Sequence, residues 1–310
     1  MNNNNYEINS KFSDNVHTKS VFAVIVGRAN VGKSSLLNKI VGEKIAIVTS
    51  KPQTTRNRIT GIVTDGDTQI VIIDTPGMHT AKTKLGQIMV RQARESVNDV
   101  DVAVVVVEAN REIGDEERSI IDILSSKKMP SVLVLNKIDL LKNKTDILSR
   151  IDEYKQLYDF DAFIPMSVLK NEGIDILIGE MKKFAVSGPH FYESDMMTDQ
   201  PEKVIAGELV REKLLLNLQD EVPHGVGVVV ESMKERENGI IDIHTTIYCE
   251  RKTHKGIIIG KNGSMLKKIA SQSRMEMEKF FDTKINLQIW VKVKEDWRNK
   301  DAVIHSLGYE

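Results

Sequence analysis

Residues 21–34 decide the fold of this chain, and they read VFAVIVGRANVGKS. The segment 27–34 matches the phosphate-loop pattern GxxxxGK[ST], in which a glycine-rich turn joins a buried strand to a helix. The apolar run at 21–26 predicts the strand. Residues 35–40, SLLNKI, begin the helix, whose positive N-terminal dipole favours bound phosphate. The stretch therefore predicts an α/β sheet with a phosphate site at a strand end.

Three further motifs follow apolar runs in the same way. DTPG at 74–77 closes the run at 69–73, NKID at 136–139 closes the run at 132–135, and SVL at 167–169 follows the run at 160–165. Ligands of open α/β sheets bind at the carboxyl ends of the parallel strands. Four motifs in this order predict a GTP site rather than a chance match to one loop pattern.

The phosphate loop needs particular residue types for particular tasks. Gly27 and Gly32 let backbone N–H groups approach the β- and γ-phosphates, which side chains would obstruct. Lys33 supplies a positive charge to the phosphate oxygens, and the Ser34 hydroxyl can ligate Mg²⁺. These four positions predict a phosphate cradle with its metal ion.

The second strand end adds to the metal site. We expect Asp74 to hold Mg²⁺ through a water and the Gly77 N–H to meet the γ-phosphate; the alternative is that Asp74 is only a turn residue. Thr55 is the expected switch residue, whose hydroxyl completes the Mg²⁺ ligands in the GTP-bound protein, and Thr54 is the alternative. The predicted magnesium ligands are therefore Ser34, Thr55 and Asp74.

The base is predicted to be guanine because of Asp139. Its carboxylate can accept two hydrogen bonds, from guanine N1–H and the 2-amino group, whereas adenine offers an acceptor at N1 and no 2-amino group. The aliphatic stem of Lys137 can cover the purine face. We expect backbone N–H groups of Val168 and Leu169 to read guanine O6, although Ala is usual where Val168 stands.

The predicted nucleotide-binding residues come from all four motifs. They are Gly27, Arg28, Ala29, Asn30, Val31, Gly32, Lys33, Ser34, Ser35, Asp74, Thr75, Pro76, Gly77, Met78, Asn136, Lys137, Asp139, Ser167, Val168 and Leu169.

Length and composition indicate a globular, multi-domain chain. It has 310 residues, of which 41% are hydrophobic and 28% charged. Its single cysteine, Cys249, can form no internal disulfide and is expected in a core. No apolar run approaches the roughly eighteen residues of a transmembrane helix. Residues 1–18 are polar and Asn-rich, which predicts a disordered extension, and we expect a cytoplasmic protein.

The region 19–186 alternates strand-like and helix-like segments. This alternation predicts an α/β P-loop GTPase domain with a mostly parallel, doubly wound sheet. Turn and polar residues at 187–201 then predict a linker. Further predicted strands lie at 59–64, 69–73, 102–107, 132–135 and 160–164, and predicted helices at 85–97, 115–125, 144–157 and 173–184.

The region 202–300 has a different pattern, and 301–310 is expected to be a C-terminal tail. A helix-like segment at 204–218 precedes strands at 226–233 and 240–249, and a final strand lies at 285–293. Between them GKNG, at 260–263, separates two helices. This α-β-β-α-α-β order predicts an α+β domain of the type II KH class, which binds RNA at a GxxG loop.

The GxxG loop supplies the predicted RNA contacts. Its glycines permit close approach of a nucleic-acid backbone, and nearby lysines add charge attraction. Residues 251–300 hold 13 Lys or Arg and 5 Asp or Glu, although such a charge excess is usually only a solvated face. Trp290 and Trp297 suggest base stacking, but a core position is favoured for Trp290. The predicted RNA-binding residues are Ile259, Gly260, Lys261, Asn262, Gly263, Lys267 and Lys268.

Three sequence segments make the chain resemble a known family. They are KPQTTR at 51–56, EVPH at 221–224 and IIIGKNG at 257–263. Residues 19–298 resemble the Era family of bacterial ribosome-assembly GTPases. The resemblance implies Mg²⁺-dependent GTP hydrolysis, binding to the 3′ end of 16S rRNA and assistance in assembling the 30S subunit. It also implies peripheral contact with the cell membrane, and we expect a monomer without a DNA partner.

The catalytic group is the least explicit part of the sequence. Ras-like enzymes place a glutamine after the DxxG motif to orient the attacking water, and Met78 stands there instead. Asn30 matches the residue that binds potassium near the β- and γ-phosphates in related GTPases; the alternative is a residue that stabilises its own turn. The predicted catalytic residues are Lys33, Asn30, Thr55 and Gly77.

Three functions compete at this point. We favour a GTP-switched RNA-binding assembly factor. One alternative is an RNA-binding protein whose nucleotide domain is merely structural, which the intact Lys33 and Asp139 oppose. The other is a signalling or membrane-remodelling GTPase whose second domain binds protein or lipid. A lipid surface would need a basic amphipathic helix with exposed aromatic residues, whereas the GxxG loop favours RNA.

Overall fold

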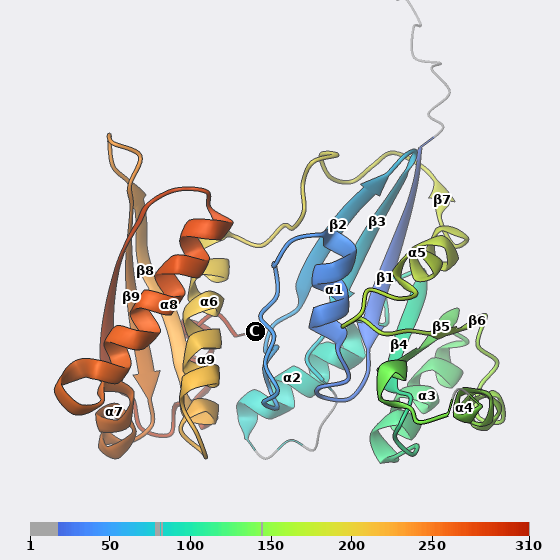
Figure 1. The fold of residues 1–310 in the computed structure, drawn as a ribbon, viewed down its shortest axis with the longest axis horizontal. Helices are drawn as coiled ribbons and strands as arrows, with labels where there is room; N and C mark the ends of the chain where they lie inside the picture. The colour runs from blue at the N-terminus through green and yellow to red at the C-terminus, as the bar shows by residue number, and fades with distance from the viewer. Residues whose placement is uncertain (1–17, 78–80, 82, 144, 310) are drawn as a thin grey trace, which may run out of the picture.

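The computed structural model describes residues 18–77, 81, 83–143 and 145–309, which form two units (Figure 1). The first unit is built on a seven-stranded sheet in the order β2-β3-β1-β4-β5-β6, with β7 paired to β1. The second unit holds a three-stranded sheet in the order β10-β9-β8.

The first sheet is mostly parallel. β1 pairs parallel to β3 and β4, whereas β2 runs antiparallel to β3 and β7 antiparallel to β1. The predicted strands are present at close to their predicted bounds, and the two-residue β7 was not predicted. The strands are β1 (Lys19–Val26), β2 (Ile59–Asp65), β3 (Thr68–Asp74), β4 (Val102–Glu108), β5 (Ser131–Asn136), β6 (Ala162–Pro165) and β7 (Val186–Ser187).

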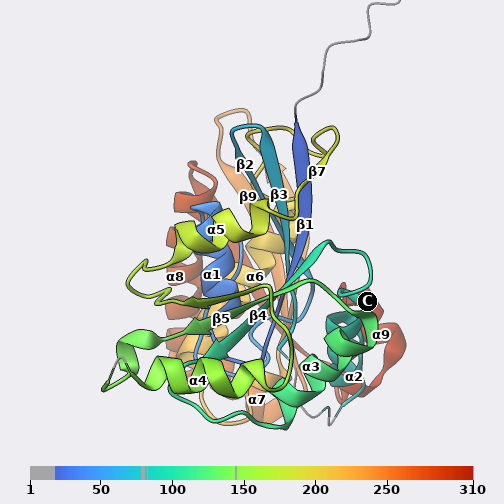
Figure 2. The ribbon, with the colours of Figure 1, turned by 90° about the vertical axis from the view of Figure 1, so that its right-hand side faces the viewer.

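Helices cover both faces of this sheet, as Figure 2 shows for α1 and α5 on one side of β1 and for α2 and α3 on the other. Along β4, Val104 and Val106 face one core, and Val105 and Val107 face the other, because successive strand residues point to opposite faces. This arrangement confirms the doubly wound class. The helices are α1 (Lys33–Val41), α2 (Lys84–Glu95), α3 (Asp115–Lys127), α4 (Asp146–Lys155) and α5 (Ile174–Lys182).

The stretch predicted as a linker lies against the first unit. The Phe191 ring packs edge-on against Phe22 at a centroid distance of 5.0 Å. The Gln69 side chain accepts from the Phe191 N–H at 2.8 Å, and the Ile62 N–H donates to the Met197 carbonyl at 2.9 Å. Side-chain and backbone contacts therefore tie this connection to the sheet.

The second unit has the predicted α-β-β-α-α-β order, with α6 and α8 packed on the core face of its sheet. β10 pairs parallel to β9, and β8 pairs antiparallel to it. Cys249 is fully buried, as expected. The elements are α6 (Glu202–Asn217), β8 (Gly227–Glu235), β9 (Ile241–Cys249), α7 (Lys252–Ile259), α8 (Ser264–Phe280) and β10 (Ile285–Val293).

Residues expected as a tail contain a further helix, α9 (Asp301–Ser306). Leu307 and Tyr309 are buried with Trp297 in one cluster, and Leu85 and Met89 of α2 belong to the same cluster. The end of the chain therefore packs against the first unit. Among the described helices, none has both the length and the apolar character that a bilayer crossing requires.

Candidate nucleotide and RNA sites

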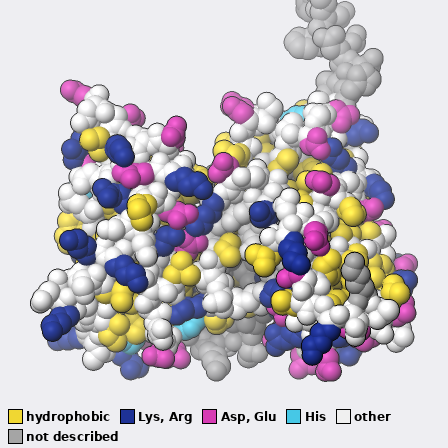
Figure 3. Space-filling model, viewed as in Figure 1, with side chains coloured by type: hydrophobic (Ala, Val, Ile, Leu, Met, Phe, Trp, Pro, Cys, Tyr) yellow, Lys and Arg dark blue, Asp and Glu magenta, His cyan; other side chains and the backbone are white. Residues whose placement is uncertain are grey.

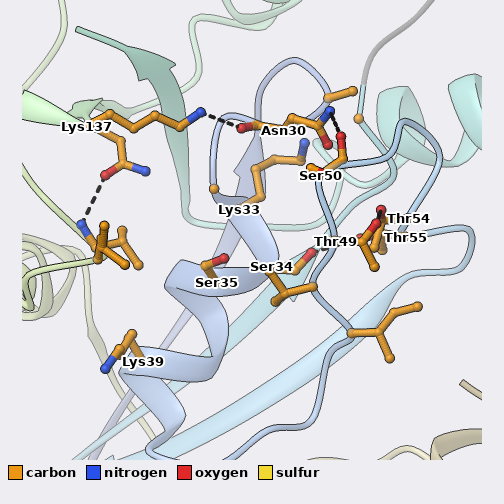
Figure 4. A pocket seen from close by; sticks show the side chains of 18 of the residues that line it. Asn30, Lys33, Ser34, Ser35, Lys39, Thr49, Ser50, Thr54, Thr55 and Lys137 are labelled. Carbon is orange, nitrogen blue, oxygen red and sulfur yellow. Dashed lines mark hydrogen bonds between the residues drawn. The ribbon is translucent and has the colours of Figure 1, made fainter. Parts of the chain in front are cut away.

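A cavity of about 720 Å³ opens where β1, β3 and β5 end (Figure 4). Parts of all four predicted motifs line it: the phosphate loop, Gly77, the NKID segment and the loop at 167–169. Strand ends thus bring together residues that lie more than a hundred positions apart in the chain. The cavity is further lined by residues that the motifs did not predict, namely Lys39, Ile47, Val48, Thr49, Ser50, Gln53 and Leu140.

The glycines of the phosphate loop are needed for packing against neighbouring segments as well as for the approach of phosphate. A Cβ on Gly27 would lie 2.3 Å from the Val106 carbonyl oxygen. Gly32 has φ 105°, and its Cβ would lie 2.4 Å from Asn136 Nδ2. Any larger residue would push the loop away from β4 and from the NKID segment.

Lys33 is buried at the base of the loop. Its Nζ donates to the carbonyl oxygens of Gly27, at 3.1 Å, and Arg28, at 2.7 Å. Burial lowers the pKa of Lys33 to about 8, although the Asp74 charge acts in the opposite direction. The ammonium lines the cavity and favours an anion there, which would offset the cost of its burial.

Three oxygen-bearing side chains converge beside Lys33. The Ser34 hydroxyl donates to Asp74 Oδ2 at 2.6 Å and lies 2.8 Å from the Thr55 hydroxyl. Asp74 is fully buried, its Oδ1 has no hydrogen-bond partner, and burial raises the pKa of its carboxyl to about 6. A buried, half-satisfied carboxylate with two hydroxyls is the hard-oxygen set that suits Mg²⁺.

The geometry favours Thr55 over Thr54 as the switch residue. The Thr54 hydroxyl points away from Ser34: it donates to the Lys51 carbonyl at 2.6 Å and lies 2.7 Å from the Thr49 hydroxyl. Of the two threonines, Thr55 is the one in contact with the predicted metal ligands.

Asn136 links the two sides of the base pocket. Its Nδ2 donates to the Val31 carbonyl at 2.8 Å, and its Oδ1 accepts from the Val168 N–H at 3.1 Å. The Val168 N–H is thus hydrogen-bonded to Asn136, and its reading of guanine O6 stays a prediction. Leu169 is 84% exposed and lines the cavity, so it keeps its predicted place.

Asp139 and Lys137 lie at the open end of the pocket. Asp139 Oδ1 accepts from the Ser167 hydroxyl at 2.5 Å. Lys137 Nζ donates to the Asn30 carbonyl at 2.9 Å and forms an ion pair with Glu108, which the motifs did not predict. Glu108 is the last residue of β4, and its place at a strand end is the signal that could have found it.

Asn30 does not stabilise its own turn. Its Nδ2 donates to the Ser50 carbonyl at 2.8 Å, which joins the phosphate loop to the segment that carries Thr55 (Figure 4). Asn30 itself has φ 66°, a left-handed conformation that asparagine tolerates better than most residues. The bond places an amide and a backbone carbonyl together at the phosphate end of the cavity.

The other predicted residues have structural contacts. The Arg28 side chain turns away to Glu117 at 3.1 Å, and the Thr75 hydroxyl donates to the Ile25 carbonyl at 2.9 Å. A Cβ on Gly77 would lie 2.8 Å from the Ala29 backbone, so these two segments touch. Those that do not line the cavity are Gly27, Arg28, Val31, Asp74, Thr75, Pro76 and Ser167, while Ser35 does. Met78 lies outside the described residues.

The GxxG loop lies between α7 and α8 in the second unit. Gly260 has φ 73° and Gly263 has φ 76°, left-handed values that favour glycine. Lys261, Asn262 and the lysines at 267 and 268 are exposed, whereas Ile259 packs against the core. Figure 3 shows Lys and Arg side chains spread over the half of the molecule that carries α8. The loop can therefore be reached by a polyanion.

The two tryptophans differ in exposure, and Trp290 does not lie in the core as expected. Trp290 is 47% exposed, so the expected core position was wrong. It lies on β10 next to the buried Val291, and its side chain projects from the opposite face of the strand. Trp297 is fully buried and stacks on Tyr309 at a centroid distance of 5.9 Å, so it cannot stack on a base.

Comparison with known proteins matches both units to families. Residues 22–137 match the family described as 50S ribosome-binding GTPase, and residues 221–298 match the KH domain family. GTPase Era of Ruminiclostridium cellulolyticum is 56% identical over 292 residues, which are 94% of this chain and 98% of that protein. GTPase Era of Clostridioides difficile is 49% identical with the same coverage.

Two solved structures are similar over nearly the whole chain. One is Era in complex with MgGDPNP and nucleotides 1506–1542 of 16S ribosomal RNA, with a TM-score of 0.91 and 33% identity. The other is a variant of Aquifex aeolicus Era bound to GDP and AlF4⁻, with a TM-score of 0.90 and 33% identity. Each alignment covers 94% of this chain and 99% of the other.

Proposed function

Since this chain belongs to the GTPase Era family and is a Mg²⁺-dependent GTPase, we propose that it binds the 3′ region of 16S rRNA and assists 30S subunit assembly. One observation carries this proposal: a complete guanine nucleotide cavity and an exposed, basic GxxG loop occur in one chain. The rRNA-bound relative has the same fold over both units, which supports RNA as the ligand of the second unit.

Within this function we assign the nucleotide site by residue. Lys33 would neutralise the phosphates, while Ser34, Thr55 and Asp74 would hold Mg²⁺, which when bound supplies charge stabilisation for phosphoryl transfer. Asp139 reads the guanine N1–H and 2-amino edge, and Ser167 orients it through the 2.5 Å hydrogen bond. We place the GTPase domain at 19–186, the linker at 187–201 and the KH domain at 202–300.

We also propose that Asn30 holds a potassium ion. The observation that supports it is the hydrogen bond from Asn30 Nδ2 to the Ser50 carbonyl at 2.8 Å, which fixes the Asn30 side chain beside the phosphate loop, where its Oδ1 would be the cation ligand. A cation there would stabilise the charge that develops on the β- and γ-phosphates. A monomeric state, a cytoplasmic location and the peripheral membrane contact that the resemblance implies stay predictions.

The RNA assignment is tested by reversing single charges. In Lys261→Glu, binding of a single-stranded RNA copy of the 16S rRNA 3′ end should weaken, because an exposed cation at the loop becomes an anion. The salt dependence should also decrease, by about 0.7 in log–log slope for each lost phosphate contact. Lys183→Glu makes the same charge change on an exposed residue of the first unit and should bind normally.

A second variant tests RNA binding at the GxxG loop without changing a lysine. In Gly263→Asp the Cβ meets open space, although φ 76° strains the backbone locally, whereas a Cβ on Gly260 would lie 2.7 Å from Met265 Cβ and disturb the fold. The Gly263 variant should lose RNA affinity and keep GTP affinity. In Lys33→Ala, by contrast, nucleotide binding should fail while RNA binding persists. Unchanged RNA affinity in both loop variants would show that the second unit binds another ligand.

A further inference from the structure

The segment that carries Thr55 lies along the second unit. Lys44 pairs with Glu212 of α6 at 2.7 Å and with Glu276 of α8 at 2.8 Å. The Val48 N–H donates to Glu212 at 3.1 Å, and Lys51 Nζ donates to the Leu218 carbonyl. The segment 44–56, which borders the nucleotide cavity, is thus bonded to α6 at several points.

Two buried arginines, one from each unit, form hydrogen bonds with the other unit on either side of Thr55. Arg211, on α6, is fully buried and donates to the carbonyls of Gln53 and Thr54. Arg56 is 2% exposed and donates to the carbonyls of Val226, at 2.6 Å, and His224, at 3.0 Å. The backbone before Thr55 and the Arg56 side chain after it are therefore both attached to the second unit.

Further contacts hold each guanidinium in place. Arg211 Nε donates to Glu208 at 2.8 Å, which balances the buried charge. The Arg56 guanidinium lies 5.8 Å from the Trp297 ring centroid and 5.7 Å from that of Tyr309. Moving the Thr55 segment away would leave two buried cations without several of their partners, which is energetically costly.

We propose that Arg211 and Arg56 are positioning residues for the GTP-bound state: through them the KH domain holds the Thr55 hydroxyl at the magnesium site. The proposal rests on the assignment of Thr55 as a Mg²⁺ ligand, made above. Since the segment is fixed before Mg-GTP arrives, less ordering is required when it binds. By linkage, Mg-GTP must stabilise the docked domain to the same extent.

GDP provides the internal reference for this effect. The threonine of a switch segment ligates Mg²⁺ only while the γ-phosphate is present, so GDP binding does not depend on this contact. Loss of Arg211 should therefore weaken the binding of Mg-GTP much more than that of GDP. A general defect in the fold would weaken both nucleotides alike.

The experiment compares Arg211→Gln with the wild type in the full chain. We expect the affinity for Mg-GDPNP to fall about tenfold, within the range of typical coupling energies, and the affinity for GDP to change less than about twofold. Arg211→Lys keeps the charge beside Glu208 but has one nitrogen to donate. It should show a smaller loss of Mg-GDPNP affinity than Arg211→Gln. It therefore still tests the proposal if Arg211→Gln does not fold.

Two controls distinguish the positioning of Thr55 from a general effect on the contact between the two units. Lys44→Gln removes two ion pairs between the same two units without touching Thr54 or Thr55, and it should leave both affinities within about twofold. In a Thr55→Ala background, Arg211→Gln should cause no further loss of Mg-GDPNP affinity, because the two changes act through one group.

The proposal is overturned by any of three results. These are an equal loss of GDP and Mg-GDPNP affinity in Arg211→Gln, an additive loss in the Thr55→Ala background, or the same selective loss in Lys44→Gln. Unchanged RNA affinity in both Lys261→Glu and Gly263→Asp would instead refute the proposed function, whatever the nucleotide affinities. The two failures are therefore distinguishable.

Discussion

Asp74 shows at the scale of a single residue how a metal site is kept at the expense of stability. Its carboxylate is fully buried with one oxygen unpaired, and its pKa is raised to about 6. A carboxyl whose folded pKa exceeds its unfolded value, about 3.9, destabilises the fold when ionised. This cost is absent below about pH 4 and complete above about pH 6.

Asp74→Asn should therefore stabilise the protein without nucleotide and magnesium. At about pH 7.5 we expect the free energy of unfolding to rise by on the order of 2 kcal/mol, and near pH 4 we expect no difference. Affinity for Mg-GDPNP should fall in the same variant. Denaturant titrations at both pH values measure the first effect, with the exposed Asp122→Asn as the control. A destabilised Asn variant at pH 7.5 would contradict the argument.

Asp139 carries a second prediction at this scale, because base selection depends on one carboxylate. In Asp139→Asn the amide can donate to the 2-oxo group of xanthine, so preference should shift from GTP towards XTP. Competition binding measures the ratio, which should change by about a hundredfold or more since a buried mismatch is strongly penalised. Asp175→Asn, an exposed change on α5, should leave the ratio unaltered. If GTP selection persisted in the Asp139 variant, another group would read the base.

At the scale of elements, the phosphate loop and the Thr55 segment are joined by the Asn30–Ser50 hydrogen bond. Replacement of potassium by sodium at constant ionic strength should lower the GTPase rate if a cation is held there. In Asn30→Ala, the rates in the two salts should be equal. Both should be about tenfold or more below the wild-type rate in potassium, because the cation that stabilises the transition state is no longer bound. Turnover assays in matched salts decide the point. Equal wild-type rates in both salts would remove the potassium site.

At the scale of the whole molecule, the last ten residues join the two units. Ile304, Leu307 and Tyr309 are buried in the cluster that includes Leu85 and Met89 of α2. Deletion of residues 301–310 should expose this cluster and cost several kcal/mol, at about 1.5–3 kcal/mol for each buried apolar side chain. Calorimetry should then show two unfolding transitions in place of one.

A milder variant tests the same contact without shortening the chain. Tyr309→Phe keeps the ring beside Trp297 and removes only a hydroxyl that lies 3.4 Å from Arg56. It should cost less than about 1 kcal/mol and leave a single transition. A deletion variant that unfolded like the full chain would show that residues 301–310 are a tail, as the sequence suggested.

Several features of this protein could be predicted from sequence because they depend on local order. The apolar runs became strands because both faces of a mostly parallel sheet are buried. The phosphate loop and NKID were recognisable because a turn that approaches phosphate or guanine needs fixed residue types at fixed spacing. The α-β-β-α-α-β order of the second unit was likewise readable from periodicity.

Only the tertiary structure decided which distant groups meet. Trp290 lies in an apolar, strand-like run and Trp297 among charged residues, yet packing exposes the first and buries the second. Glu108 reaches Lys137, Asn136 occupies the Val168 N–H, and Arg211 reaches the segment before Thr55. No spacing rule predicts such pairs. Their partners come together only after the two sheets, the connection at 187–201 and helix α9 have packed. Local sequence thus determined the chemistry available to this protein, and long-range packing determined how its two domains share that chemistry.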